Sequence, residues 1–152
     1  YLARRLVRMA VEDIGLADPQ ALALTRAAAE TYEQLGSPEG ELALAEATLY
    51  LALAPKSNAA YLAYGAAQRA AREHGSLPPP LHIRNAPTRL MKQLGYGKDY
   101  AYDHDAPDRF SGQDYFPEAM ARQRFYEPTD QGFERELGER AARLERLRQE
   151  RE

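Results

Sequence analysis

The chain has 152 residues, of which 44% are apolar and 28% are charged, a balance typical of a folded globular domain. It contains no cysteine, which excludes disulfides, thiolate zinc sites and cysteine nucleophiles and fits a reducing compartment. The formal net charge of -3 argues against a dedicated nucleic-acid-binding domain, although it allows a local basic face. No apolar run approaches the roughly 18 residues of a membrane span, so we expect neither a membrane partner nor a signal peptide.

The first half of the chain predicts four helices separated by glycine and proline signals. The expected ranges are about 2–14, 19–35, 38–54 and 58–74. Gly15 and Gly36 each follow a helix and can adopt the left-handed turn that ends it, while Pro55 ends the third helix. Asp18 and Ser37 each precede a proline, which is typical of a capping side chain followed by the first helical turn.

The fourth helix begins after Ser57 or Asn58, and either side chain is a suitable N-cap. We expect an antiparallel bundle whose core is formed by one stripe on the third helix and one on the fourth. The stripes contain Leu42, Leu49 and Leu53, and Tyr61, Tyr64 and Ala67 or Gln68. No capping residue precedes the helical spacing that starts at Leu2, so we expect the chain to be a fragment of a longer protein.

The second half of the chain is more irregular. The prolines in 77–81 predict an extended segment, and a short helix is expected from about Pro87 to Leu94. The segment from about 96 to 117 holds most of the tyrosines, and we expect it to lie across the bundle because aromatic content argues against disorder. The residues expected to hold it are Tyr96, Tyr100, Tyr102, Phe110, Tyr115 and Phe116.

A charged helix is expected from about 129 to 152, where Glu and Arg alternate at helical spacing. Its thin apolar stripe consists of Leu137, Ala141, Leu144 and Leu147. A solvated terminal helix and a coiled-coil seam both fit this pattern, but the length offers few heptads.

Two short motifs suggest chemistry, and both have a simpler structural explanation. Gly95-Tyr96-Gly97-Lys98 lacks the spacing and the preceding strand of a phosphate loop, and is typical of a helix end and turn. Asp103-His104-Asp105, with His82 elsewhere, suggests a metal site, but three adjacent residues rarely face one ion. We therefore predict no catalytic residue, no cofactor-binding residue and no metal site in this chain.

Basic residues cluster in two parts of the chain and are candidates for contacts with DNA phosphates or with another subunit. The candidates are Arg4, Arg5, Arg8, Lys56, Arg84, Arg89 and Lys92. Phosphate contact would use them on one basic face. The alternative is a set of ion pairs with the many acidic side chains of the chain or of an interface.

Several longer motifs resemble the C-terminal region of the RarA/MgsA family, which comprises replication-associated recombination AAA+ ATPases of the clamp-loader clade. The resemblance covers nearly the whole chain and includes similarity to the Werner-helicase-interacting protein of eukaryotes. The motifs that carry it are YLARRLVRMA, EDIGLADP, GSPEGE, YLALAPKSN, RNAPT and LGYGK.

This resemblance implies a helical, clamp-loader-collar-like domain that assembles subunits into a homotetramer, within a bacterial protein of the cytoplasm and nucleoid. It implies that ATP and Mg bind to an upstream module, and that the whole protein acts on DNA at stalled replication forks. Single-stranded-DNA-binding protein is a further partner that the family suggests. We therefore predict an oligomerisation domain, with a DNA-contacting module of the same protein as the alternative.

We predict that the whole chain is one domain with three parts. The expected parts are a four-helix oligomerisation core over 1–76, a short helix with the tyrosine-rich segment over 77–128, and the charged terminal helix over 129–152.

Overall fold

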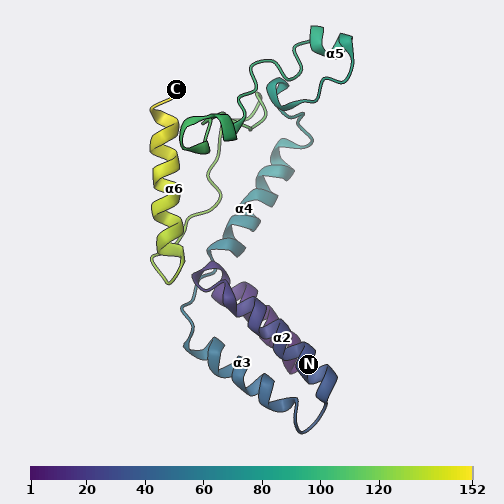
Figure 1. The fold of residues 1–152 in the computed structure, drawn as a ribbon, viewed down its shortest axis with the longest axis vertical. Coiled ribbons are helices and arrows are strands. Elements are labelled where there is room, and N and C mark those ends of the chain that lie inside the picture. The colour runs from purple at the N-terminus through teal and green to yellow at the C-terminus, as the bar shows by residue number, and fades with distance from the viewer. Residues whose placement is uncertain (152) are drawn as a thin grey trace. The chain divides into compact units, whose positions relative to one another are not determined.

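A computed structural model describes residues 1–151, and this part of the chain contains helices and no β-strand. The predicted all-α fold class is therefore confirmed (Figure 1). The α-helices are α1 (Leu2–Met9), α2 (Gln20–Leu35), α3 (Glu41–Leu53), α4 (Ala59–His74), α5 (Arg89–Gln93) and α6 (Glu134–Gln149). None of the helices in the described residues is both long enough and apolar enough to cross a membrane.

The contacts divide the chain into two compact units, which are described separately. The first unit contains residues 1–67 and 125–139, and the second contains residues 68–124 and the chain from Arg140 onward. Two of the three boundaries lie inside α4 and α6, so each of these helices contributes to both units, and the third lies between Arg124 and Phe125 outside the helices. The predicted three-part organisation into 1–76, 77–128 and 129–152 stays a prediction.

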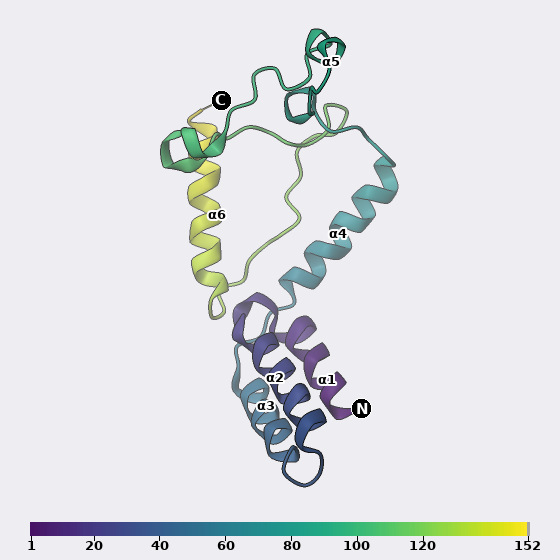
Figure 2. The same ribbon diagram turned by 45° about the vertical axis from the view of Figure 1, so that its right-hand side comes forward.

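The first unit is built on a bundle in which α1, α2 and α3 pack against one another (Figure 2). Small alanine side chains let these helices approach closely. The buried cluster consists of Leu6, Ala10, Ile14, Ala21, Ala28, Leu44, Ala47 and Leu51. All of these residues belong to α1, to the π-helical turn that continues it over Ala10–Ile14, or to α2 and α3.

The helix ends in the first unit follow local signals in the sequence. Gly15 has φ +54° and ends the first helical segment, as predicted. Asp18 accepts a hydrogen bond from the Gln20 amide at 3.0 Å, and Gly36 ends α2 with φ +69°. Ser57 rather than Asn58 caps α4, because its hydroxyl accepts a hydrogen bond from the Ala59 amide at 3.1 Å.

The predicted start of the third helix at Pro38 was wrong, because α3 begins at Glu41. Residues 38–40 form a turn instead, in which the Gly40 amide donates to the Gly36 carbonyl at 2.7 Å. The Ser37 hydroxyl lies 2.5 Å from Glu41 Oε1, so it contacts a carboxylate and does not cap an amide.

The second unit begins with the end of α4, which Gly75 follows with φ +67°. The proline-rich segment is extended up to a 3₁₀ turn at Leu81–Ile83. Thr88 caps α5 by accepting a hydrogen bond from the Met91 amide at 3.2 Å, so this helix begins two residues later than Pro87, where it was expected. The rigid ring of Pro87 precedes the cap rather than occupying the first helical turn.

The tyrosine-rich segment contains two 3₁₀ turns, Asp103–Asp105 and Pro107–Arg109. Within its own unit, Phe110 lies beneath the guanidinium of Arg148 at 5.1 Å from the ring centre. The Gln113 side chain bridges two backbone groups, accepting from the Ala101 amide and donating to the Asp99 carbonyl. The expected position of this segment across the bundle stays a prediction.

The terminal helix α6 begins at Glu134 and not near Thr129 as expected. The five preceding residues belong to the first unit and form a turn, in which the Phe133 amide donates to the Ala17 carbonyl at 2.8 Å. Gly132 has φ +52° within this turn, a conformation that a helix does not contain.

Candidate interaction surfaces

Helix α3 is apolar on both of its faces. Leu44, Ala47 and Leu51 form the inner face and are buried in the bundle. The predicted core stripe was wrong, because Leu42, Leu49 and Leu53 lie on the outer face with 68%, 65% and 87% of their surface exposed. When both faces of a helix are apolar, helical periodicity does not predict which face is buried. In α3 the buried face is the one that carries Ala47, whose small side chain allows close packing against the neighbouring helices.

The tyrosine stripe predicted on the fourth helix was also wrong as a core element. Tyr61 and Tyr64 are both exposed, as is the neighbouring Leu62. The buried residues of α4 are instead Ala59 and Ala70. In residues 59–67 of α4, the buried position is occupied by a small alanine, Ala59. The large side chains of this part of the helix therefore lie on the surface of the first unit.

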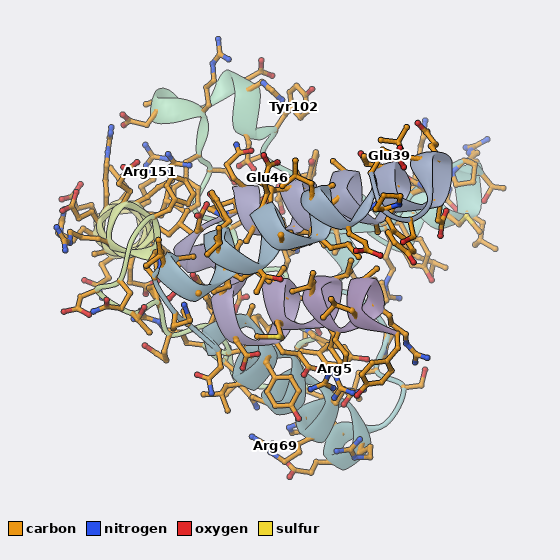
Figure 3. All side chains as sticks on the ribbon, turned by 90° about the horizontal axis from the view of Figure 1, so that it is seen from below. Arg5, Glu39, Glu46, Arg69, Tyr102 and Arg151 are labelled. Atoms are coloured by element: carbon orange, nitrogen blue, oxygen red, sulfur yellow. The ribbon has the colours of Figure 1, made fainter. Side chains whose placement is uncertain are left out.

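A groove of about 600 Å³ runs along the outer side of α2 and α3 in the first unit. It is lined by Asp18, Leu24, Glu46, Leu49, Tyr50, Leu53, Ala54 and Pro55. Asp18 is already engaged, because the Tyr50 hydroxyl donates to it at 2.5 Å; this hydrogen bond, followed by burial, raises the pKa of Tyr50. Glu46, which is labelled in Figure 3, forms no ion pair with any residue of 1–151.

Four of the seven predicted contact residues lie in the first unit. Arg4 and Arg5 are exposed on α1. Arg8 is engaged by Glu12, with 2.8 Å between Nε and Oε1. The Lys56 ammonium donates to two main-chain carbonyls at the end of α3, at 2.8 and 2.5 Å, so it neutralises the negative end of that helix.

The other three predicted contact residues lie in the second unit. The Arg84 guanidinium donates to the Pro79 carbonyl at 2.6 Å and lies 5.3 Å above the centre of the Tyr96 ring. Arg89 and Lys92 are exposed on α5 and form no ion pair within residues 1–151. Because the seven residues are divided between the two units, their predicted common basic face stays a prediction.

Charge is distributed unequally between the two units. The first unit contains 6 Lys and Arg against 13 Asp and Glu, a formal charge of -7. The second contains 14 against 10, a formal charge of +4. The net charge of -3 is therefore the sum of one net acidic and one net basic unit, and such asymmetry favours electrostatically selective contacts.

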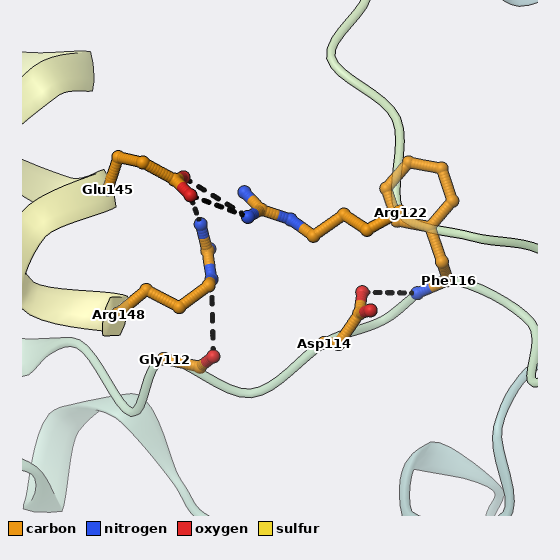
Figure 4. Close-up of polar contacts among 6 residues, drawn as sticks. All are labelled: Gly112, Asp114, Phe116, Arg122, Glu145 and Arg148. Carbon is orange, nitrogen blue, oxygen red and sulfur yellow. Dashed lines mark hydrogen bonds and ion pairs between the residues drawn. The ribbon is translucent and has the colours of Figure 1, made fainter. Parts of the chain in front are cut away.

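Glu145 of α6 is the acceptor for two arginines of the second unit. Arg122 donates to both carboxylate oxygens of Glu145 at 3.1 Å, and Arg148 donates to the same carboxylate at 2.8 Å (Figure 4). These two arginines lower the pKa of Glu145, the hydrogen bond from Arg122 having the larger effect. Arg148 also donates to the Gly112 carbonyl at 3.2 Å, which joins the tyrosine-rich segment to the helix.

The two short motifs form turns. Gly95 ends α5 with φ +85°, and the Lys98 amide donates to the Gly95 carbonyl at 3.2 Å, as expected of a helix end and turn. Asp103 accepts a hydrogen bond from the Ser111 amide at 2.7 Å. Hydrogen bonding from the Ser111 side chain, followed by this bond from its amide, lowers the pKa of Asp103. Within residues 1–151, no three His, Asp or Glu side chains form a group that could hold a metal ion.

A buried carboxylate, which the sequence analysis missed, joins three segments of the first unit. Glu134 is fully buried at the start of α6. Its Oε2 accepts hydrogen bonds from the Ser57 hydroxyl at 2.7 Å and from the amide and hydroxyl of Thr129 at 2.9 and 2.7 Å. Its Oε1 accepts from the Tyr126 hydroxyl at 2.9 Å. Nothing in the local pattern around Glu134 signals a partner 77 residues earlier in the chain.

The environment of Glu134 favours its charged form. Burial by itself raises the pKa of this carboxyl, but the hydrogen bonds from Thr129, Ser57 and Tyr126 outweigh it and leave the pKa below its usual value. Burial, together with the hydrogen bond to Glu134, raises the pKa of Tyr126 to about 12. The carboxylate is therefore ionised and its phenol partner is neutral over the physiological pH range.

The family model described as MgsA AAA+ ATPase C terminal matches residues 1–145. The helical bundle with its exposed faces is thus the C-terminal domain of an AAA+ ATPase. The chain belongs to the MgsA AAA+ ATPase C-terminal family, as its motifs suggested.

Curated relatives support this membership. The chain is 54% identical over 99% of its length to Replication-associated recombination protein A of Coxiella burnetii, and covers 34% of that protein. It is 48% identical over 95% of its length to the Escherichia coli K12 protein of the same name, of which it covers 32%. It is 44% identical over 84% of its length to ATPase WRNIP1 of Dictyostelium discoideum, of which it covers 15%. The chain thus spans about a third of the length of the bacterial relatives.

Proposed function

We propose that this domain assembles copies of its own protein, into a homotetramer as the family resemblance implies. The observation that carries the proposal is the outer face of α3, where Leu42, Leu49 and Leu53 are largely exposed on a well-packed bundle. A helix that is apolar on nearly all sides is normally buried on nearly all sides. Burying one such leucine contributes about 1.5–3 kcal/mol, so this face supports a stable contact between subunits.

The activity and partners of the whole protein are inferred from the family and are part of the same proposal. We infer that an upstream AAA+ module binds ATP and Mg and that the whole protein acts on DNA at stalled replication forks in the bacterial cytoplasm. Single-stranded-DNA-binding protein is a partner consistent with that role. The C-terminal domain would hold the ATPase modules together without itself performing catalysis.

Light scattering coupled to gel filtration tests the assembly. We expect the 152-residue chain to elute as a tetramer at micromolar concentrations. Leu49→Asp should lower the measured mass of the assembly, because a carboxylate replaces an apolar side chain at the contact. Leu35→Asp is the matched control, since Leu35 is also exposed but lies at the end of α2, outside the groove. A wild-type chain that remains monomeric would refute the proposal.

Contact with DNA is the second candidate, and the positive charge of the second unit favours it. Arg84, Arg89 and Lys92 have no carboxylate partner within residues 1–151 and could face phosphates. We expect single-stranded DNA to bind at low salt and to dissociate steeply as salt rises. The test is fluorescence anisotropy of a labelled oligonucleotide. The variant with Arg84, Arg89 and Lys92 all replaced by alanine should bind at least about tenfold more weakly, whereas the control Arg26→Ala, in the acidic unit, should bind like the wild type. Equal binding by both variants would exclude this surface.

A further inference from the structure

We propose that α5 of one molecule docks in the α2–α3 groove of a second molecule, so that the contact between copies is head-to-tail. This inference rests on the proposed self-assembly and names the two surfaces that meet. The groove belongs to the acidic unit and α5 belongs to the basic unit.

Helix α5 has the apolar side chains that such a groove requires. Leu90 and Leu94 are four residues apart, so they project from the same side of the helical turn, and they are 64% and 57% exposed. The groove offers Leu49 and Leu53 from α3 and Leu24 from α2. Helix-in-groove recognition uses apolar anchors at this i, i+4 spacing.

The charges at the rims of the two surfaces are also complementary. Glu46 lies between Leu42 and Leu49 on the exposed face of α3 and forms no ion pair within residues 1–151. Arg89 lies beside Leu90 on α5 and is likewise without a carboxylate partner there. The other charged group that lines the groove, Asp18, is already engaged by the Tyr50 hydroxyl.

A symmetric contact in which α3 meets α3 is disfavoured by the same charges. It would bring two units of formal charge -7 together and place Glu46 of both molecules at one apolar interface. Like charges at an interface weaken association, while opposite charges guide the correct partner. In a head-to-tail pair, one molecule still has a free groove and the other a free α5. Further copies can therefore add until a ring closes. This geometry fits a tetramer better than a contact that ends at a dimer.

Complementation between two variants tests the proposal. Leu53→Asp damages the groove and leaves α5 intact, and Leu90→Asp damages α5 and leaves the groove intact. We expect each variant alone to be monomeric by light scattering, and their equimolar mixture to form a one-to-one dimer through its single undamaged contact. Circular dichroism equal to that of the wild type verifies that each variant folds.

The outcomes separate this inference from the proposed function. If the wild-type chain assembles and Leu90→Asp assembles equally well, the copies meet elsewhere and the inference is overturned while self-assembly stands. If the mixture stays monomeric although the wild type assembles, the head-to-tail arrangement is overturned. If the wild-type chain is itself monomeric, the proposed function is overturned and this inference with it.

A charge exchange tests the pairing of Glu46 with Arg89. We expect Glu46→Arg and Arg89→Glu each to weaken association about tenfold, and the double variant to recover to within about threefold of the wild type. The control double variant combines Glu46→Arg with Arg69→Glu, an exposed residue of the same basic unit outside α5. Recovery in both double variants would mean that only net charge matters, which would overturn the specific pairing.

Discussion

Replacing Glu134 by alanine is expected to lower the free energy of unfolding by about 3 kcal/mol. The carboxylate is fully buried and accepts four hydrogen bonds from Ser57, Thr129 and Tyr126. Its removal leaves the buried Ser57 hydroxyl and the partly buried groups of Thr129 and Tyr126 without this acceptor, and each unsatisfied group costs free energy that burial of the alanine methyl does not replace. Urea denaturation followed by circular dichroism measures the loss, at matched protein concentration because assembly adds to apparent stability.

The matched control is Glu136→Ala, in the same helix but exposed, which should change stability by less than about 0.5 kcal/mol. Equal effects of the two substitutions would mean that the Glu134 network contributes nothing beyond an exposed glutamate.

The network also predicts a pH dependence. Because the pKa of Glu134 is lowered in the folded chain, the stability it adds is present above the unfolded carboxyl pKa and is lost as pH falls through the folded value. Glu134→Gln, which has no ionisable group, should therefore lose less stability than the wild type on acidification.

Replacing Gly132 by alanine is expected to destabilise the first unit by more than about 3 kcal/mol. A methyl group at this position would lie 2.1 Å from the Ala17 carbonyl oxygen and 2.7 Å from Cγ of Pro55. The backbone is also in the left-handed region, with φ +52°. The turn that leads into α6 would have to move away from Ala17, which would break the hydrogen bond from the Phe133 amide and shift Glu134 from its partners.

Gly36→Ala separates the two causes of this effect. Gly36 has a similar φ of +69°, but a methyl group there would meet no atom within 4 Å. It should therefore cost only the conformational strain of a backbone region that only glycine adopts freely, about 1–3 kcal/mol. Equal losses of unfolding free energy in Gly132→Ala and Gly36→Ala would show that the chain moves the added methyl group away from Ala17 and Pro55 at little cost.

Local signals in the sequence predicted most helix ends and failed where tertiary contacts override them. Gly15, Gly36 and Gly95 end helices as expected, because a turn with a positive φ at glycine depends on only a few adjacent residues. The starts at Pro38 and near Thr129 were wrong, since a turn held by hydrogen bonds to Gly36 and to Ala17 takes the place of the first helical residues. The family itself was recognised from contiguous motifs, which need no knowledge of contacts.

By itself the sequence determined that this protein is helical, that its chemistry-bearing motifs are turns, and that it belongs with the C-terminal domains of MgsA-type ATPases. Only the tertiary structure decided which leucines of α3 are buried and which are exposed, because both faces of that helix are apolar enough to form a core. It also decided that Ser57 and Glu134 meet, and that acidic and basic residues are divided between two units. Contacts between residues far apart in the chain depend on packing, which no local pattern encodes.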